Sequence, residues 1–169
     1  MTEDVRRLAE QIKARFPDRV NPPITAENEV KLLGLGVDIA PEVLELLRVF
    51  DGTTDYLFDS IYFSGSVGPP DVPTIGWHIE LFKDRIDEPA FEDEGDDSGW
   101  SSSVRQVMFS RGWTPVISTI DGDVWFIDHD PAPDGADGQL FRMDVAQGCS
   151  SVEIAAPSLA VFLEKLVGE

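Results

Sequence analysis

Residues 112–141 read GWTPVISTIDGDVWFIDHDPAPDGADGQLF, and this stretch decides the fold. Residues 116–120 are rich in β-branched side chains, which predicts a strand. The Asp-Gly-Asp sequence at 121–123 predicts a turn, because glycine tolerates positive φ and aspartate hydrogen-bonds its own backbone. A second apolar run at 124–128 completes a hairpin. After a loop rich in proline and glycine, residues 139–143 return as a third strand.

Helices are predicted ahead of this hairpin. Residues 2–16 and 41–50 carry apolar side chains at helical spacing. Pro41 suits the first turn of its helix, since that position needs no backbone N–H. A further helix begins at Thr25 and stops at Gly34.

The remaining segments predict strands, except for one segment whose secondary structure the sequence does not assign. Strand-like patterns occur at 56–63, 104–109 and 151–155. Residues 75–82 suit a strand or a short helix, because their periodicity does not decide between the two. A final helix follows the capping residue Ser158. This order predicts a single-domain α+β fold, with one central, mainly antiparallel sheet packed by the N-terminal helices and a C-terminal helix.

The composition is strongly acidic, with 32 acidic and 13 basic residues and a formal net charge of −19. Such a surface repels phosphate backbones, so no direct binding of nucleic acid is expected. The charge suits a protein that only needs solubility, or one that gains association rate toward a basic partner. We expect no membrane span and no secretory signal, and the single cysteine, Cys149, suits a reducing cytoplasm.

Residues 84–97 contain eight acidic residues and one arginine. With the glycines and serines beside them, they predict a solvated loop. The alternative is a binding segment that attracts a cationic partner. Aromatic residues are less expected in a purely solvated loop, and here they can serve as apolar anchors. The residues expected to bind a partner here are Phe91, Glu92, Asp93, Glu94, Asp96, Asp97 and Trp100.

The sequence contains no recognisable catalytic constellation. Motifs of serine hydrolases, zinc proteases, P-loops and dinucleotide sites are missing. His129 lies between Asp128 and Asp130, where it could ligate a metal, but a partly exposed loop residue is the simpler interpretation. The aspartates of this loop do not follow EF-hand spacing and suit tight turns instead. We therefore expect no enzyme activity, no cofactor and no metal.

The central stretch resembles the SUKH superfamily, Smi/Knr type. Its members carry W-x-P, then D-G, then an apolar strand that ends in D, and finally a Pro/Gly loop that leads to G-Q. The matching residues here are Trp113, Pro115, Asp121, Gly122, Trp125, Ile127, Asp128, Gly138, Gln139 and Leu140. The similarity extends from Pro23 to Leu163. It implies a single SUKH (Smi/Knr-like) domain over residues 1–169, with a helical extension at 1–22 and the core at 23–169.

The resemblance implies a binding module rather than an enzyme. Bacterial members are typically immunity proteins that bind and neutralise a cognate toxin, often a nuclease, whereas fungal members regulate cell-wall assembly. An acidic chain suits the first role, because nucleases are basic where they hold nucleic acid. The expected partner is thus a basic toxin domain, and a regulatory or scaffold protein without a toxin partner is the alternative. The sheet surface near Trp125 joins the expected partner surface, while Asp121, Asp128 and Gln139 are expected to hold turns and loop hydrogen bonds.

Overall fold

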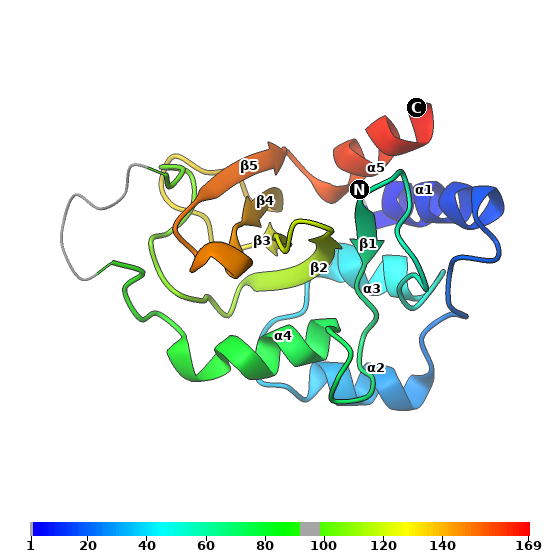
Figure 1. Cartoon of the computed structure of the whole chain (residues 1–169), viewed down its shortest axis with the longest axis horizontal. Coiled ribbons are helices and arrows are strands. Elements are labelled where there is room, and N and C mark those ends of the chain that lie inside the picture. The colour runs from blue at the N-terminus through cyan, green and yellow to red at the C-terminus, as the bar shows by residue number, and fades with distance from the viewer. Residues whose placement is uncertain (1, 92–98) are drawn as a thin grey trace.

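The computed structural model describes residues 2–91 and 99–169 (Figure 1). Five of the expected partner-binding residues lie outside the described residues: Glu92, Asp93, Glu94, Asp96 and Asp97. The described helices are α1 (Thr2–Arg15), α2 (Ala26–Leu33), α3 (Pro41–Leu47), α4 (Ile75–Phe82) and α5 (Leu159–Gly168), with short 3-10 turns η1 (Lys83–Arg85) and η2 (Val145–Gln147). The strands are β1 (Ile61–Phe63), β2 (Trp113–Thr119), β3 (Val124–Asp128), β4 (Gln139–Met143) and β5 (Val152–Ala156).

The five strands form one antiparallel sheet in chain order, β1-β2-β3-β4-β5. This confirms the predicted α+β fold with a central antiparallel sheet. The β2–β3 hairpin turns at Gly122, whose φ of 88° only glycine adopts without strain. The Gly122 N–H donates to the Thr119 carbonyl at 3.0 Å, which closes the turn. The Asp-Gly turn therefore lies where the sequence placed it.

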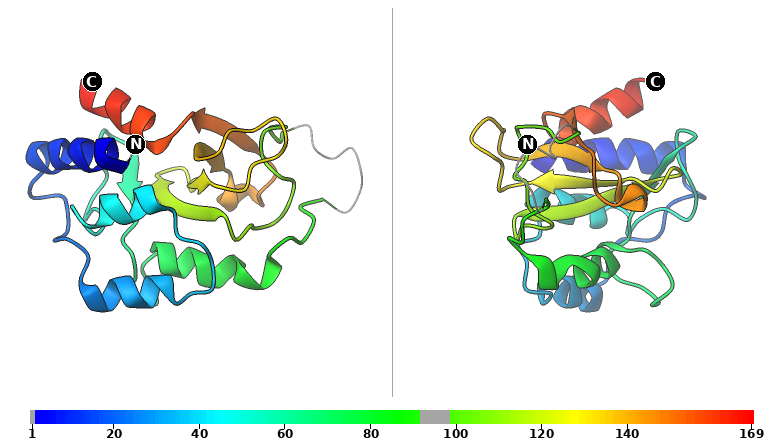
Figure 2. Two further views of the ribbon diagram at one scale, coloured as in Figure 1. Left: turned by 180° about the vertical axis from the view of Figure 1, so that it is seen from behind. Right: turned by 60° about the vertical axis from the view of Figure 1, so that its left-hand side comes forward.

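Both faces of the sheet are covered over most of β2, β3 and β4, whereas the three middle residues of β5 are exposed. Figure 1 shows α2 and α4 along one side of the sheet and α1 with α5 on the other, and the right-hand view of Figure 2 agrees. On the α4 side, aromatic rings pack on one another. Phe126 and Phe141 are in register and stacked at 5.2 Å, and Trp113 lies 4.9 Å from Phe141. Phe109 joins this group by stacking on Phe82 of α4.

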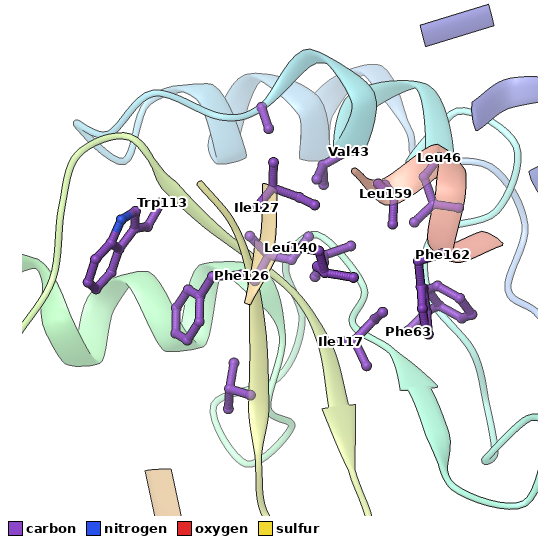
Figure 3. Packing of buried hydrophobic residues seen from close by; sticks show 14 of the residues in the cluster. Val43, Leu46, Phe63, Trp113, Ile117, Phe126, Ile127, Leu140, Leu159 and Phe162 are labelled. Carbon is purple, nitrogen blue, oxygen red and sulfur yellow. The ribbon is translucent and has the colours of Figure 1, made fainter. Parts of the chain in front are cut away.

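The opposite face carries aliphatic residues under α3 and α5. Figure 3 shows Val43 and Leu46 of α3 and Leu159 of α5 gathered over Ile127 and Leu140 of the sheet. All five are at most 1% exposed.

Helix α1 packs against α3 and α5. Its buried residues Val5, Leu8, Ala9 and Ile12 belong to the same hydrophobic cluster as the sheet. The segment expected as an N-terminal extension thus contributes to the core.

Residues 75–82, left open by periodicity, form helix α4. The Thr74 hydroxyl caps it by accepting from the Trp77 N–H at 3.1 Å. Ile75, Ile79 and Phe82 are spaced to share one buried face. Among the residues that the structure describes, no helix has the length and apolar character needed to cross a membrane.

The predicted strand at 104–109 is wrong. This segment makes only isolated bridges, Pro89 with Val107 and Ile86 with Phe109. The segment opposite it cannot continue a ladder, because Pro89 has no N–H and Asp87 adopts a positive φ of 60°. The 56–63 prediction is shortened for a similar reason, since Phe58 and Asp59 both have positive φ and leave β1 only three residues.

Candidate functional site

Asp128 and Gln139 form a buried polar pair that fixes the loop between β3 and β4. The Gln139 Nε2 amide donates to Asp128 Oδ2 and to the Ser103 carbonyl, each at 2.8 Å. The backbone N–H of Asp130 donates to Asp128 Oδ1 at 2.9 Å, and that of Ala136 donates to Gln139 Oε1 at 3.1 Å. Burial raises the pKa of Asp128, while the hydrogen bonds from Gln139 and Asp130 oppose the rise. The hydrogen bonds of both side chains hold the loop in place.

The other residues of the central motif are also structural. Trp113 is fully buried in the aromatic core, and Pro115 precedes a β-bulge in β2. Gly138 has a φ of 79° and donates its N–H to the Asp128 carbonyl at 2.7 Å. Asp121 is the exception, because its exposed side chain has no hydrogen-bond partner in the described part of the chain. The turn depends on Gly122 rather than on the Asp121 side chain.

His129 is held between two carboxylates. Its Nδ1 lies 2.8 Å from Asp137 Oδ1, and its Nε2 lies 2.8 Å from Oε1 of the buried Glu42. Carboxylates accept hydrogen bonds, so both ring nitrogens donate and the ring is an imidazolium. Burial lowers the pKa of His129, but the bond to Asp137 and the charge of Glu42 outweigh it and raise the pKa above its ordinary value. His129 thereby ties the β3–β4 loop to the first turn of α3.

These contacts occupy the atoms that a metal would need. Asp130 accepts from Arg105 and from the Ser110 hydroxyl, and Arg105 also binds Asp87 at 3.0 Å. Across residues 2–91 and 99–169, no three His, Cys, Asp or Glu side chains are grouped so that they could hold a metal ion. Burial raises the pKa of the Cys149 thiol, which favours the neutral thiol over the thiolate.

Phe91 and Trp100 contact each other rather than pointing outward. Their rings meet edge to face at 5.4 Å, and Phe91 is packed against the core. Trp100 is only 7% exposed and donates its indole N–H to the Val104 carbonyl at 3.2 Å. Trp100 anchors this segment to β5, through a bridge to Val152. Its expected role as an apolar anchor for a partner stays a prediction.

Trp125 lies on β3, the central strand of the sheet, and is half-buried. Its ring is 5.0 Å from that of Phe162 in α5. A shallow groove of about 320 Å³ runs beside it, bordered by the ion pair of Arg142 with Glu153. The Trp125 indole N–H is buried and has no hydrogen-bond partner within the described chain. Trp125 is thus one wall of a groove and not a projecting side chain.

A second hollow, which the sequence did not reveal, lies beside the tip of the β2–β3 hairpin. It has a volume of about 470 Å³, which falls within the range of ligand sites. We call it the hairpin-tip cleft and define it by its main lining residues, Asp55, Tyr56, Tyr62, Trp77, His78 and Asp123.

The cleft exists because the aromatic side chains packed on the α4 side of the sheet do not extend as far as its hairpin end. Helix α4 and Phe109 cover the sheet near Trp113, but the hairpin end of the same face is covered only in part. There Tyr62, Ser118 and Val124 stand in register on β1, β2 and β3 and form the floor. Its side walls come from α4, η2 and the segment before β1.

His78 is the most deeply placed polar group of the cleft, at 4% exposed. Its Nδ1 donates to the Thr74 carbonyl at 2.9 Å, so the lone pair of the neutral ring lies on Nε2. Burial lowers the pKa of His78 although the Thr74 bond opposes this, which keeps the ring neutral at pH 7. Nε2 has no hydrogen-bond partner among the residues that the structure describes.

The hairpin contributes a carboxylate to the same cleft. Burial raises the pKa of Asp123, and the nearby charge of Arg142 lowers it, while Asp144 and Asp121 add to the rise. No arginine or lysine lines the cleft within the described chain. Within the described chain, the side chains of His78 and Asp123 are not hydrogen-bonded to each other, and the backbone N–H of Asp123 donates to the Thr119 hydroxyl at 3.3 Å.

Two features could have indicated the cleft from the sequence. Thr74 is a capping residue three positions before Trp77, and a helix that begins there places Trp77 and His78 in its first turn. Tyr56 and Tyr62 flank a tight turn and lie 5.8 Å apart. Their convergence with α4 depends on long-range packing, which no local pattern encodes.

No protein-family model matches this sequence, and no curated protein matches it. The resemblance to the SUKH superfamily therefore remains a prediction.

Proposed function

We propose that this chain is a non-catalytic protein-binding module that captures a basic protein. In its most concrete form, it is a bacterial immunity protein of the SUKH, Smi/Knr type, which binds and neutralises a basic toxin domain such as a nuclease. The motif of residues 113–140 supports the family, and the charge of the chain supports the partner.

The observation that carries the proposal is the excess of acidic over basic residues, which ion pairs within the chain do not neutralise. The chain has 13 basic residues, and at least eight of them are already in ion pairs with its own carboxylates: Arg6, Arg7, Lys31, Arg48, Lys83, Arg85, Arg105 and Arg142. The excess of 19 negative charges therefore has few internal cations left to pair with. A basic partner would supply the missing charge and would be steered toward the chain.

The acidic residues 84–97 add local charge to this account. A nuclease domain is basic where it grips phosphates, so an inhibitor can occupy that surface with carboxylates. Steric and electrostatic blocking of this kind needs no catalytic group on the inhibitor.

A tagged-chain capture from the native host, followed by mass spectrometry, tests the proposal. We expect one dominant basic partner at low salt. A bait in which Glu92, Asp93, Glu94, Asp96 and Asp97 are changed to lysine should retain less of that partner. A bait with neutral substitutions at the remote exposed residues Glu3, Asp4 and Glu10 controls for nonspecific charge effects. Several weak partners without a basic toxin would instead favour the regulatory or scaffold alternative.

A further inference from the structure

The hairpin-tip cleft places hydrogen-bond acceptors between aromatic walls. His78 offers the lone pair of Nε2, because its Nδ1–H is already bonded to a backbone carbonyl. Asp123 offers a carboxylate that has no ion pair within the described chain. Trp77 and the two tyrosines supply ring faces, whose negative quadrupole attracts cations. A complementary ligand therefore carries both N–H donors and positive charge.

The charge around the cleft has the same sign. Asp55 lies on its rim, and Asp121 and Asp144 act on Asp123 through space. Arg142, whose charge lowers the pKa of Asp123, does not line the cleft and is bonded to Glu153 at 2.6 Å. The cleft therefore carries negative charge where it opens to solvent. The acceptor without a partner in the described chain, His78 Nε2, lies deep inside it.

The geometry points to the hairpin-tip cleft as the seat for an arginine side chain of a basic protein partner. A guanidinium is planar and weakly hydrated, so it stacks on Trp77 or Tyr62 more favourably than the strongly hydrated ammonium of lysine does. Its several N–H donors can reach His78 Nε2 and the Asp123 carboxylate from one position. The inference rests on the proposed function in one respect, because it assigns the arginine to the partner.

Binding of the side chain alone can be measured without any partner. The probe is N-acetyl-L-arginine amide, titrated into the full-length chain while the tryptophan indole N–H signals are followed by NMR. N-acetyl-L-citrulline amide has nearly the same shape without the charge and serves as the control ligand. We expect saturable shifts of the Trp77 signal with the arginine probe and a Kd at least about fivefold weaker with the citrulline probe.

Two pairs of variants locate the binding. Trp77→Ala removes a wall, whereas Leu81→Ala alters another exposed position on α4 that does not line the cleft. Asp123→Asn removes the lining carboxylate, whereas Asp134→Asn makes the same charge change at an exposed position of the β3–β4 loop that does not line the cleft. Because W77A lacks the indole that reports binding, the affinities of the variants are compared by calorimetry. We expect W77A to weaken the arginine probe about threefold or more and D123N about two- to fivefold. L81A and D134N should stay close to the wild type.

Equal binding of arginine and citrulline probes would overturn the inference, as would an affinity that D134N weakens as much as D123N does. Equal affinity for N-acetyl-L-lysine amide would overturn the choice of arginine. The proposed function is tested separately. If the arginine probe binds at the cleft but no basic protein is captured from the host, the site stands without the function. If a basic protein is captured equally by wild type and W77A, the function stands and the cleft is not its contact.

Discussion

The amide of Gln139 donates a 2.8 Å hydrogen bond to the carboxylate of Asp128, and both residues are buried at facing positions of β4 and β3. The same amide reaches the Ser103 carbonyl, so one side chain joins the central hairpin, its following loop and the segment before β2. The carboxylate of Asp128 is therefore engaged in hydrogen bonds that hold the fold together.

Replacing Asp128 by Asn should destabilise the fold by about 1–3 kcal/mol. An asparagine can still accept from the Asp130 N–H, but its NH₂ group then faces the Gln139 NH₂ group, and neither can accept. Turning the Gln139 amide over would break its bonds to Ser103 and Ala136. Urea unfolding of D128N against the control D134N, an exposed change in the same loop, measures the difference. Equal stability of the two variants would mean that the pair is dispensable.

His129 should make stability depend on pH in a defined direction. Its folded pKa is raised, so the folded state binds the proton more tightly than the unfolded state does. Its contribution is fully present below the unfolded pKa of about 6.5 and is lost as pH rises through the folded value. The groups that face it are Glu42 and Asp137.

The measurement is the free energy of unfolding of wild type and His129→Gln between pH 6 and pH 9. The wild type should lose its advantage over H129Q as the pH rises. An advantage that is constant, or that grows with pH, contradicts the imidazolium assignment.

Two glycine substitutions separate backbone strain from steric collision. Gly122 and Gly148 both have positive φ, of 88° and 91°. A Cβ on Gly122 would lie 2.6 Å from the Ala146 Cβ, whereas a Cβ on Gly148 would meet nothing within 4 Å. We expect G148A to cost about 1 kcal/mol from strain alone and G122A to cost more. Thermal unfolding of both variants gives the comparison, and a G122A cost no larger than that of G148A would show that the hairpin tip moves freely away from η2.

Helix α1 should be necessary for the stability of the whole chain. Ile12 is fully buried between α1 and the rest of the core, so Ile12→Ala should cost about 2–5 kcal/mol. Leu33→Ala removes a similar volume at a position that is 51% exposed and should cost far less. If I12A unfolded at the same urea concentration as L33A, α1 would be a detachable extension.

The local parts of the fold could be predicted from the sequence. The Asp-Gly turn, the two strands that flank it, the cap at Ser158 and the helix after Pro41 all depend on residues within a few positions of one another. Residues 104–109 misled the prediction, because strand propensity cannot reveal that their neighbour in space contains Pro89.

The candidate site was harder to predict, because it also depends on contacts between residues that are far apart in the sequence. Asp128 and Gln139 were assigned a loop-holding role from their motif, and their hydrogen bonds agree with it. The hairpin-tip cleft was missed, because it joins α4, β1 and the hairpin across more than 40 residues of sequence between Trp77 and Asp123. The burial of Trp100 could not be predicted, because an aromatic residue beside a polar segment can equally face solvent or anchor that segment to the core.

The most direct test of the central claim is the salt dependence of partner binding. The captured basic protein is purified, and its Kd for this chain is measured by calorimetry from 50 to 500 mM salt. The proposal predicts that binding weakens steeply and steadily as salt rises, because screening removes the attraction between the acidic chain and a basic surface. An affinity that does not change over this range would contradict it, as would the absence of any basic protein among those captured at the lowest salt.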